Sequence, residues 1–414
     1  MIADDRSSHT QAEPHFFSTI LDINRFDLTC RALSVLGSSP DGAVASPNSA
    51  RCHRRRLGET SRRHLSSGEL PNIWSDVHGA AQVHARRGAH VMTSSQLGAG
   101  EPGARFEHQP VMLDELLSVF ADMAPGLFVD ATLGGAGHAS ALLHRHSSMQ
   151  LLGIDRDQDA LRAATKALGS MSGRATLRHA RFDRIADMVA DAGATTIVGA
   201  LFDLGVSSPQ FDVAERGFSY RHDAPLDMRM DRSQSVSAFD IVNEWSFEDL
   251  VRMLQDYADE KFAARVARAM IAARPIERTV QLADVVTMAI PAAARRRGGH
   301  PAKRTFQAIR IAVNSELEIL ESSLEATIEL LEPGARLAVL TYHSGEDRIV
   351  KRTFRHAVTG GCACPPGLPC GCGAHPVAKA IRAPREATKS EQLSNPRSRS
   401  AKLRVIERLA GEVV

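Results

Sequence analysis

The apolar positions of residues 111–203 alternate between short runs and stretches with helical spacing. Helical spacing predicts amphipathic helices over Met112–Phe120, Ala139–Arg145 and Asp157–Leu168. Short apolar runs predict strands at Leu127–Val129 before Asp130, Leu151–Ile154 before Asp155, and Ile197–Leu201 shortly before Asp203. Ala175–His179 is a candidate for a further strand between the last two. Because strands that alternate with helices form parallel sheets, this pattern predicts a doubly wound α/β fold.

The alternation stops after the fourth predicted strand. Residues 213–310 read as a loop followed by helices at Phe247–Tyr257, Glu260–Ala273 and Val280–Ile290, with another from Lys303. Strand character returns at Leu337–Tyr342 and Lys402–Glu407. We therefore expect an all-helical insertion over residues 213–310, between two parts of one core at 106–212 and 311–414.

Residues 1–105 are rich in Ser, Gly, Arg and His and lack sustained periodicity, which predicts a disordered N-terminal extension. Three interpretations are open: a basic arm, an organellar transit peptide (against which Asp4 and Asp5 argue), or an extension upstream of a misplaced start. We favour the third, because Met92 precedes a polar lead-in to Phe106–Pro110. A native N-terminal peptide beginning at Thr93 would support this hypothesis, and abundant peptides from residues 1–90 would contradict it.

Composition narrows the function classes only slightly. The 50 basic and 48 acidic residues nearly balance, so net charge alone does not indicate a nucleic-acid-binding protein. No run of 18 apolar residues exists and the first residues lack an apolar signal region, so we expect a cytoplasmic protein. Four of the six cysteines lie within residues 362–372, which fits a metal site or a reducing compartment better than a disulfide framework.

A glycine-rich turn, Gly134–His138, follows the first predicted strand. Glycines there let the backbone approach a ligand, and Asp155 at the next strand end suits ribose hydroxyls. The dinucleotide fingerprint fails, because Ser140 stands where the third glycine belongs. This favours a cofactor without pyrophosphate, S-adenosylmethionine above all. The alternative is a tight turn without a ligand.

Several blocks of the chain from Phe106 onward together resemble the bacterial RsmH (MraW) family of small-subunit ribosomal RNA cytosine-N4 methyltransferases. The matching blocks are His108–Val111, Gly134–His138, Gly153–Arg156, Asp203–Gln210, Glu215–Ser219, Pro225–Asp231, Arg304–Gln307, Asn314–Leu317 and His343–Arg352. One departure is Gly345, where the family usually carries leucine. The resemblance does not extend over residues 1–105.

The resemblance implies a class I S-adenosylmethionine-dependent methyltransferase fold, Rossmann-like, with a helical insertion. It also implies methylation of the exocyclic amine of a cytidine of 16S ribosomal RNA near the decoding centre, with the small subunit as partner. The cofactor contacts would then fall on Gly135, Ala136, Gly137, His138, Asp155, Phe182, Asp203 and Gln210.

An aromatic amine is a poor nucleophile, because its lone pair is delocalised into the ring. The enzyme must accept a hydrogen bond from the amine and align it with the methyl group. The catalytic candidates are Asp203 and the corner Ser207, Ser208 and Pro209, which resembles the S/D/N-P-P-aromatic motif of amino-methyltransferases. The second proline and the aromatic residue are absent, so Phe211, Phe218 or Tyr220 would stack on the base. Whether Asp203 contacts cofactor, amine or both stays open, and its alternative role is a helix N-cap.

The remaining substrate candidates are Phe218, Tyr220, Arg229, Arg304 and His343. His343 either lines the cytidine pocket or caps a helix. The Pro225–Asp231 block either clamps RNA through Arg229 and Arg232 or joins the insertion to the core by ion pairs. We interpret Glu215–Asp231 as a hinge between sheet and insertion.

Two basic clusters are candidates for phosphate contacts, with a solvated face as the alternative for each. The first comprises Arg295, Arg296, Arg297, His300, Lys303 and Arg304; the second comprises Lys379, Arg382, Arg385, Lys389, Arg397 and Arg399. A target cytidine in folded RNA would be flipped out or already unpaired.

The cysteine-rich segment predicts a structural zinc site. Cys362, Cys364, Cys370 and Cys372 form two C-x-C pairs, and four thiolates leave no open coordination position. C-x-C is a tighter chelate than the usual C-x₂-C, and free loop thiols are the alternative.

Two other functions remain open on the sequence. One is an amino-methyltransferase of the same fold that acts on DNA or protein, and the other is a non-catalytic RNA-binding relative. The oligomeric state does not follow from the sequence.

Overall fold

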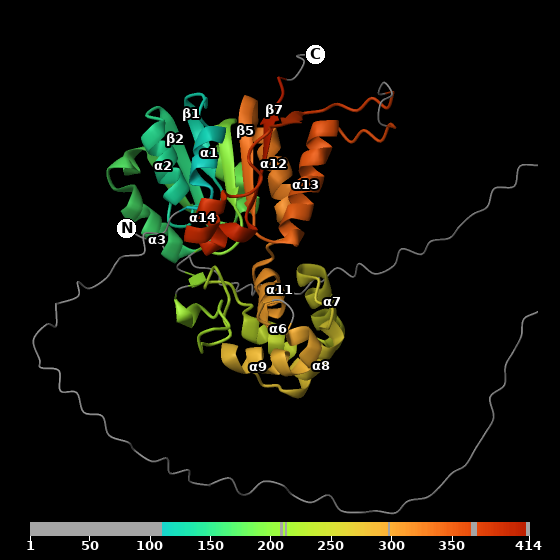
Figure 1. Cartoon of the computed structure of the whole chain (residues 1–414). Coiled ribbons are helices and arrows are strands. Elements are labelled where there is room, and N and C mark those ends of the chain that lie inside the picture. Colours follow the sequence, from blue (N-terminus) through green and yellow to red (C-terminus); the bar gives the residue numbers. More distant parts are fainter. Residues whose placement is uncertain (1–109, 208–209, 212, 297–298, 366–370, 411–414) are drawn as a thin grey trace, which may run out of the picture. The chain divides into compact units, whose positions relative to one another are not determined.

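The computed structural model describes residues 110–207, 210–211, 213–296, 299–365 and 371–410, so the predictions for residues 1–105 lie outside it. Within these ranges seven strands form one sheet in the order β3-β2-β1-β4-β5-β7-β6 (Figure 1). The strands are β1 (Gly126–Asp130), β2 (Met149–Asp155), β3 (Ala175–His179), β4 (Ile197–Asp203), β5 (Leu331–Thr341), β6 (Ala378–Ala380) and β7 (Lys402–Arg408). Strands β1 to β5 are all parallel to one another, and β7 runs antiparallel to its neighbours β5 and β6.

Helices cover both faces of the sheet because neighbouring strand residues point to opposite sides. Phe128 and Leu151 pack with one set of helices, whereas Val129 and Leu152 pack with the other. The first set is α1 (Leu113–Val119), α2 (Gly137–Arg145) and α3 (Gln158–Leu168). The second set is α4 (Ile185–Asp191), α12 (Leu320–Leu330) and α13 (Ser344–Thr359). Short 3₁₀ turns and a late helix complete this part: η1 (Gly169–Arg174), η2 (Phe182–Arg184), α14 (Lys389–Ser394) and η4 (Pro396–Ser400).

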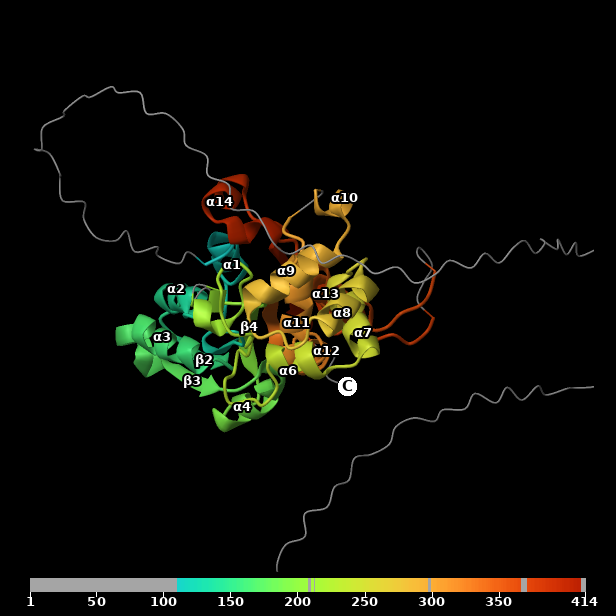
Figure 2. The same ribbon diagram turned by 90° about the horizontal axis from the view of Figure 1, so that it is seen from below.

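The segment between β4 and α12 is helical and has an apolar core of its own. It contains η3 (Ala214–Arg216), α6 (Ala238–Glu244), α7 (Phe247–Ala258), α8 (Ala263–Ala272), α9 (Thr279–Ala289), α10 (Ala292–Arg295) and α11 (Lys303–Asn314). Figure 2 shows α6 to α9 gathered around α11. The core of this insertion includes Leu254, Val266 and Ile309, each fully buried.

The structure confirms the predicted fold class. The strand order, with β7 alone reversed between β5 and β6, is that of class I methyltransferases, and the helical insertion follows β4. Some elements differ from the pattern-based expectation: α2 begins at Gly137 instead of Ala139, and α4, α6 and α12 were not predicted. Helices α4 and α6 are only seven residues long, so they offer little periodic signal. In α12 the buried Leu320, Leu324 and Ile328 do recur at helical spacing, and this signal was missed. Among the described residues, no helix is both long and apolar enough to span a membrane.

Candidate active site

Three carboxylates stand at the carboxyl ends of adjacent parallel strands. Asp130 ends β1, Asp155 ends β2 and Asp203 ends β4, and Asp130 is in register with residues of both neighbouring strands. The chain changes direction across the sheet between β1 and β4, and open α/β sheets bind ligands at such a switch point. The sequence patterns placed these side chains at strand ends, and parallel pairing brings those ends to one edge.

The glycine-rich turn leads from β1 into α2 and is tied to β2. Gly134 N–H donates to Asp155 Oδ2 at 2.7 Å, and Asp157 N–H donates to Asp155 Oδ1 at 2.8 Å. Ala136 has a left-handed φ of 63° and directly precedes α2. A Cβ added at Gly135 would meet no atom within 4 Å, so the backbone borders open space there. The turn therefore combines fixed backbone with room for a ligand.

Burial shifts the titration of the two carboxyls beneath this turn. It raises the pKa of Asp155 to about 6, against the opposing hydrogen bonds from Asp157 and Gly134. It raises the pKa of Asp130 to about 8; the Thr132 N–H opposes this rise, while the charges of Asp203 and Asp155 add to it. At neutral pH Asp155 is therefore mainly ionised and Asp130 mainly neutral.

Asp203 is held by groups from three other segments. Its backbone N–H donates to Thr132 Oγ1 at 2.6 Å, and Tyr342 Oη donates to its Oδ1 at 2.6 Å. Nδ1 of the buried His138 lies 3.6 Å from Asp203 Oδ2, while His138 Nε2 lies 2.9 Å from Val111 O. The Asp203 side chain is 26% exposed, so the carboxylate is oriented by its neighbours and still reachable.

The corner after β4 is anchored by Gln210. Ser207 N–H donates to Gln210 Oε1 at 3.0 Å, and Gln210 Nε2 donates to Asp157 Oδ2 at 2.9 Å. Ser207 Oγ is buried without a hydrogen-bond partner among the described residues. The other two catalytic candidates, Ser208 and Pro209, lie outside those residues. A buried hydroxyl without a partner is costly unless a ligand satisfies it.

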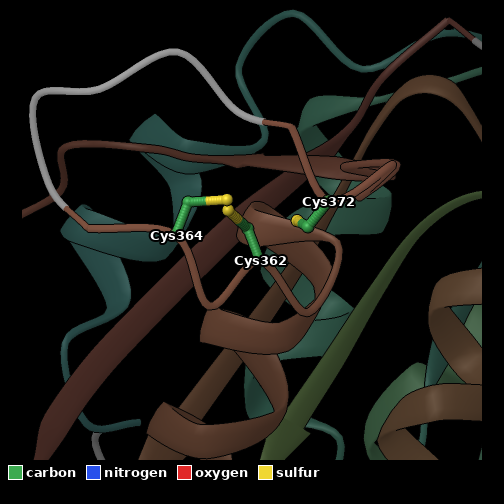
Figure 3. A group of neighbouring side chains, drawn as sticks. All are labelled: Cys362, Cys364 and Cys372. Atoms are coloured by element: carbon green, nitrogen blue, oxygen red, sulfur yellow. The ribbon is translucent and has the colours of Figure 1, made fainter.

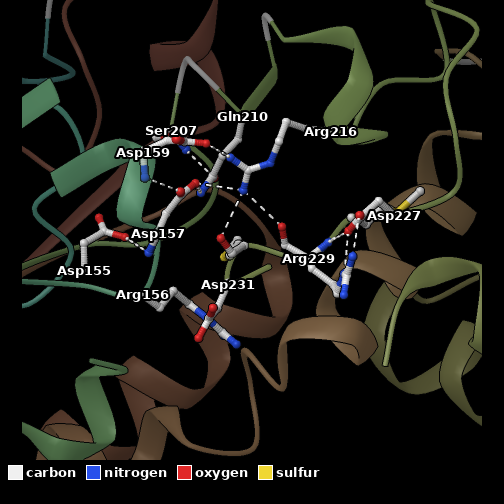
Figure 4. A network of polar contacts seen from close by, with 12 residues as sticks. Asp155, Arg156, Asp157, Asp159, Ser207, Gln210, Arg216, Asp227, Arg229 and Asp231 are labelled. Atoms are coloured by element: carbon white, nitrogen blue, oxygen red, sulfur yellow. Dashed lines mark hydrogen bonds and ion pairs between the residues drawn. The ribbon is translucent and has the colours of Figure 1, made fainter. Parts of the chain in front are cut away.

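Arg216 joins this corner to the insertion (Figure 4). Its guanidinium donates to Asp157 Oδ2 at 2.8 Å and to the carbonyls of Arg229 and Met230, each at 3.0 Å. A further contact at 3.2 Å reaches Asp159 Oδ2. Arg216 is only 3% exposed, so the ion pair with Asp157 is a buried one.

The aromatic candidates of the insertion differ in exposure. Phe218 is 5% exposed and packs in the insertion core, whereas Phe211 is 40% exposed. Tyr220 is stacked on His300, with ring centroids 4.3 Å apart, and meets Phe306 edge to face. Tyr220 and Phe211 therefore have more freedom to meet a base than Phe218 has. Phe182, the cofactor candidate after β3, is half-buried against Phe202.

The basic candidates of the insertion already have partners in the protein. Arg229 Nε and Nη2 each donate to the Asp227 carboxylate at 2.9 Å, and its Nη1 donates to Gln234 O at 2.8 Å. Arg304 Nη1 donates to Asp259 O at 2.7 Å and is otherwise exposed. These contacts tie Arg229 to its own segment, so its ion pair with Asp227 does not join the insertion to the core.

His343 caps α13 and lies beside the site. Its side chain accepts from Glu346 N–H, while Tyr342 N–H donates to Glu346 Oε2 at 2.7 Å. His343 Nε2 is 3.0 Å from Glu346 Oε1. Burial would raise the pKa of Glu346, but the hydrogen bond and charge of His343 and the charge of Arg310 hold it below the usual range. The helix cap foreseen as the alternative is present, one residue from Tyr342.

Several side chains of the second basic cluster have partners within the protein. In the second, Lys379 pairs with Glu407 at 2.7 Å and Arg385 lies 3.7 Å from Asp347. Arg399 Nε donates to Gln392 O at 2.9 Å. In the first cluster, Arg297 lies outside the described residues.

Sequence reasoning missed Tyr342, Thr132 and Arg216 as parts of this site. Thr132 and Tyr342 are 71 and 139 positions from the Asp203 that they contact. Their only signal was their place at or just after a strand end of the same sheet. Arg216 was in a matching block, but its buried partner Asp157 was taken only as a helix start.

Comparison with known proteins gives one family over this region. A model of the MraW methylase family matches residues 105–409. Ribosomal RNA small subunit methyltransferase H of Symbiobacterium thermophilum is 50% identical over 314 residues, covering 74% of this chain and 98% of that protein. The protein of the same name from Limosilactobacillus fermentum is 50% identical over 313 residues, covering 74% and 99%. A solved structure described as a putative rRNA-methylase from Clostridium thermocellum aligns with a TM-score of 0.36 and 12% identity, over 73% of this chain and 100% of that one. Because the family model spans most of the chain and these relatives match it over nearly their whole length, the chain belongs to the MraW methylase family.

Proposed function

We propose that this chain transfers a methyl group from S-adenosylmethionine to the exocyclic N4 amine of a cytidine in 16S ribosomal RNA near the decoding centre. Family membership supports the reaction class, and the names of its relatives support small-subunit ribosomal RNA as the substrate. Two observations support the chemistry. Tyr342 orients the Asp203 carboxylate at the end of β4, and the buried Ser207 hydroxyl has no hydrogen-bond partner among the described residues and lies near the glycine turn. A ribosomal substrate supports a cytoplasmic location for the protein.

The strand-end cluster fits the cofactor. Asp155 uses one lone pair of each carboxylate oxygen for backbone N–H groups, which leaves others for ribose hydroxyls. The open backbone at Gly135 offers space for the cofactor beside the start of α2. When bound, S-adenosylmethionine supplies an electrophilic methyl group on a sulfonium. Gly135, Ala136, Gly137, His138, Asp155, Phe182, Asp203 and Gln210 are the proposed contacts.

The acceptor groups would act on the target amine. We assign Asp203 and Ser207 to accept hydrogen bonds from the amine N–H groups, which returns lone-pair density to nitrogen. The new N–C bond would form as the methyl–sulfur bond breaks, and the sulfonium would leave as a neutral thioether. Tyr342 and Thr132 hold Asp203 in place, so little reorganisation is needed during the reaction. The proton lost from the methylated amine passes to Asp203 and then to water, because that carboxylate is partly exposed.

The insertion would hold the RNA, with Tyr220, Arg304 and the first basic cluster as its contact groups. Arg304 is exposed on α11, and Tyr220 lies against His300, which belongs to that cluster. Phosphate contacts of this kind should weaken steeply as salt concentration rises. Arg216 and Asn314 keep the insertion in register with the sheet: Asn314 Oδ1 accepts from Met230 N–H, and the Asn314 carbonyl accepts from Arg156.

The test uses full-length protein, labelled S-adenosylmethionine and small ribosomal subunits that lack the modification. Label in a single cytidine of 16S RNA, released as N4-methylcytidine on digestion, is the expected result. Ser207→Ala should retain cofactor binding and lose most of the transfer. Asp203→Asn, which also changes a proposed cofactor contact, should lose most of the transfer even at saturating cofactor. Wild-type transfer rates in Asp203→Asn would contradict the site assignment.

The same experiment separates the rival functions. Label that appears in DNA or in ribosomal protein supports an amino-methyltransferase with another substrate. RNA binding without any transfer supports a non-catalytic relative. Either outcome would overturn the proposed reaction.

A further inference from the structure

Three cysteine sulfurs meet in the loop that joins α13 to β6, outside the catalytic cluster. The Sγ atoms of Cys362, Cys364 and Cys372 all lie within 4.8 Å of one another. Figure 3 shows the three side chains converging from two limbs of the loop. A disulfide joins only two sulfur atoms, so it does not explain why a third lies beside them. A metal site does, because one ion is bound by several cysteine sulfurs.

The loop has little else to hold it. Its described residues 361–365 and 371–377 are exposed or half-buried, so apolar burial does not fix their positions. The two limbs nevertheless approach closely at the base: a Cβ at Gly360 would lie 2.4 Å from the His375 backbone, and Val377 N–H donates to Ala357 O at 2.9 Å. This closure carries Cys362 and Cys372 toward each other.

We propose that Cys362, Cys364 and Cys372 bind one Zn²⁺ ion that fixes this loop. Zinc–thiolate bonds of about 2.3 Å place the sulfurs of a tetrahedral site about 3.8 Å apart, which agrees with the observed cluster. The fourth thiol of this segment, Cys370, lies outside the described residues, so the site is argued from the three sulfurs that converge. Binding by thiolates contributes folding free energy to a loop whose described residues are exposed or half-buried.

The ion would be structural and take no part in methyl transfer. The sixteen residues of α13 separate the loop from His343, which caps the other end of the helix beside Tyr342. A helix of that length spans about 24 Å. Figure 1 shows the loop leaving α13 at the end away from the cap.

Metal content of full-length protein, purified under reducing conditions without chelator, tests the proposal. We expect about one zinc per chain in the wild type, and almost none in Cys362→Ser or Cys372→Ser. Cys52→Ser, which removes a thiol outside the segment, is the matched control and should keep its zinc. Cobalt substituted for zinc should give thiolate-to-metal absorption in the wild type and the control but not in the two cluster variants.

A second measurement guards against variants that fail to fold. Far-UV circular dichroism and cofactor binding should match the wild type, while proteinase K should cut residues 360–377 faster after chelation. Folded wild-type protein that binds neither zinc nor cobalt would overturn the proposal. So would full zinc content in Cys362→Ser, or a disulfide among these cysteines found by mass spectrometry under native conditions. None of these readouts depends on methyl transfer.

Discussion

Replacing Arg216 with alanine should be among the most destabilising single changes at the junction of sheet and insertion. The side chain is 3% exposed and donates to Asp157 Oδ2 and to two backbone carbonyls. Its removal leaves the buried Asp157 carboxylate without its cation and leaves the carbonyls of Arg229 and Met230 each short of a donor. Breaking one partner of a buried pair costs about 3–5 kcal/mol. We therefore expect the free energy of unfolding to fall by that amount.

The assay is urea unfolding followed by two signals. Trp245 lies in the insertion, so its fluorescence, measured in a Trp74→Phe background, reports that part, while far-UV circular dichroism reports sheet and insertion together. Arg252→Ala is the control: Arg252 pairs with Asp249 on α7, but their side chains are 68% and 47% exposed. Exposed pairs contribute less than about 1 kcal/mol. Arg216→Lys keeps the charge without the planar fork and should fall between the two.

A fall of less than about 1 kcal/mol in the free energy of unfolding of Arg216→Ala would refute this prediction, because a buried carboxylate without its cation destabilises the protein by more than that. The prediction also fails if Arg252→Ala destabilises the protein as much as Arg216→Ala does. In that case the effect would come from removing arginine from the insertion, whatever its burial.

Three further predictions concern the catalytic edge and the turn beside Arg216. Tyr342→Phe removes the hydrogen-bond donor to Asp203 and should lower kcat about 10- to 100-fold, with little change in cofactor affinity. The expected size follows because a hydrogen bond to a charged group contributes about 1.5–3 kcal/mol. An unchanged rate of transfer in single-turnover assays would refute this. Burial raises the pKa of Asp130 to about 8, so its contribution to stability is full below about pH 4 and is lost as the pH rises through 8. Asp130→Asn should therefore reduce the fall of Tm between pH 5 and 8. The same dependence of Tm on pH in both proteins would contradict this prediction. Gly217→Ala should lower the free energy of unfolding by about 1–3 kcal/mol in urea titrations, because φ at this position is 72° and the new Cβ would lie 2.4 Å from Pro225 O. A loss below about 0.5 kcal/mol, which is typical of surface substitutions, would argue against this strain.

The catalytic sheet could be predicted because its information is local. β1, β2 and β4 are each a short, mostly apolar run that ends on an aspartate, and this pattern can be recognised without knowing which strands pair. The family blocks extended the same inference to the cofactor turn, Asp155 and the Asp203–Gln210 corner. The structure brings these residues to one edge, where hydrogen bonds link Gly134 to Asp155 and Gln210 to Ser207.

In the cysteine cluster and the insertion, the local sequence pattern left alternatives open. Spacing alone gave four thiols and a choice between zinc and free thiols, while the structure adds that three of the sulfurs converge. In the insertion, sequence left Arg229 undecided between RNA and ion pairing. The structure pairs it with Asp227, two positions away.

The sequence by itself determined the order of elements, the position of polar residues at strand ends and, through its motifs, the family. Only the tertiary structure decided which groups, distant in the sequence, contact the polar residues at the strand ends. Tyr342 and Thr132 reach Asp203 because β5 and β1 are both hydrogen-bonded to β4. Arg216 reaches Asp157 because the insertion folds back onto α3. Such contacts depend on strand pairing and side-chain packing across long separations, and no local pattern of apolar and polar residues encodes them.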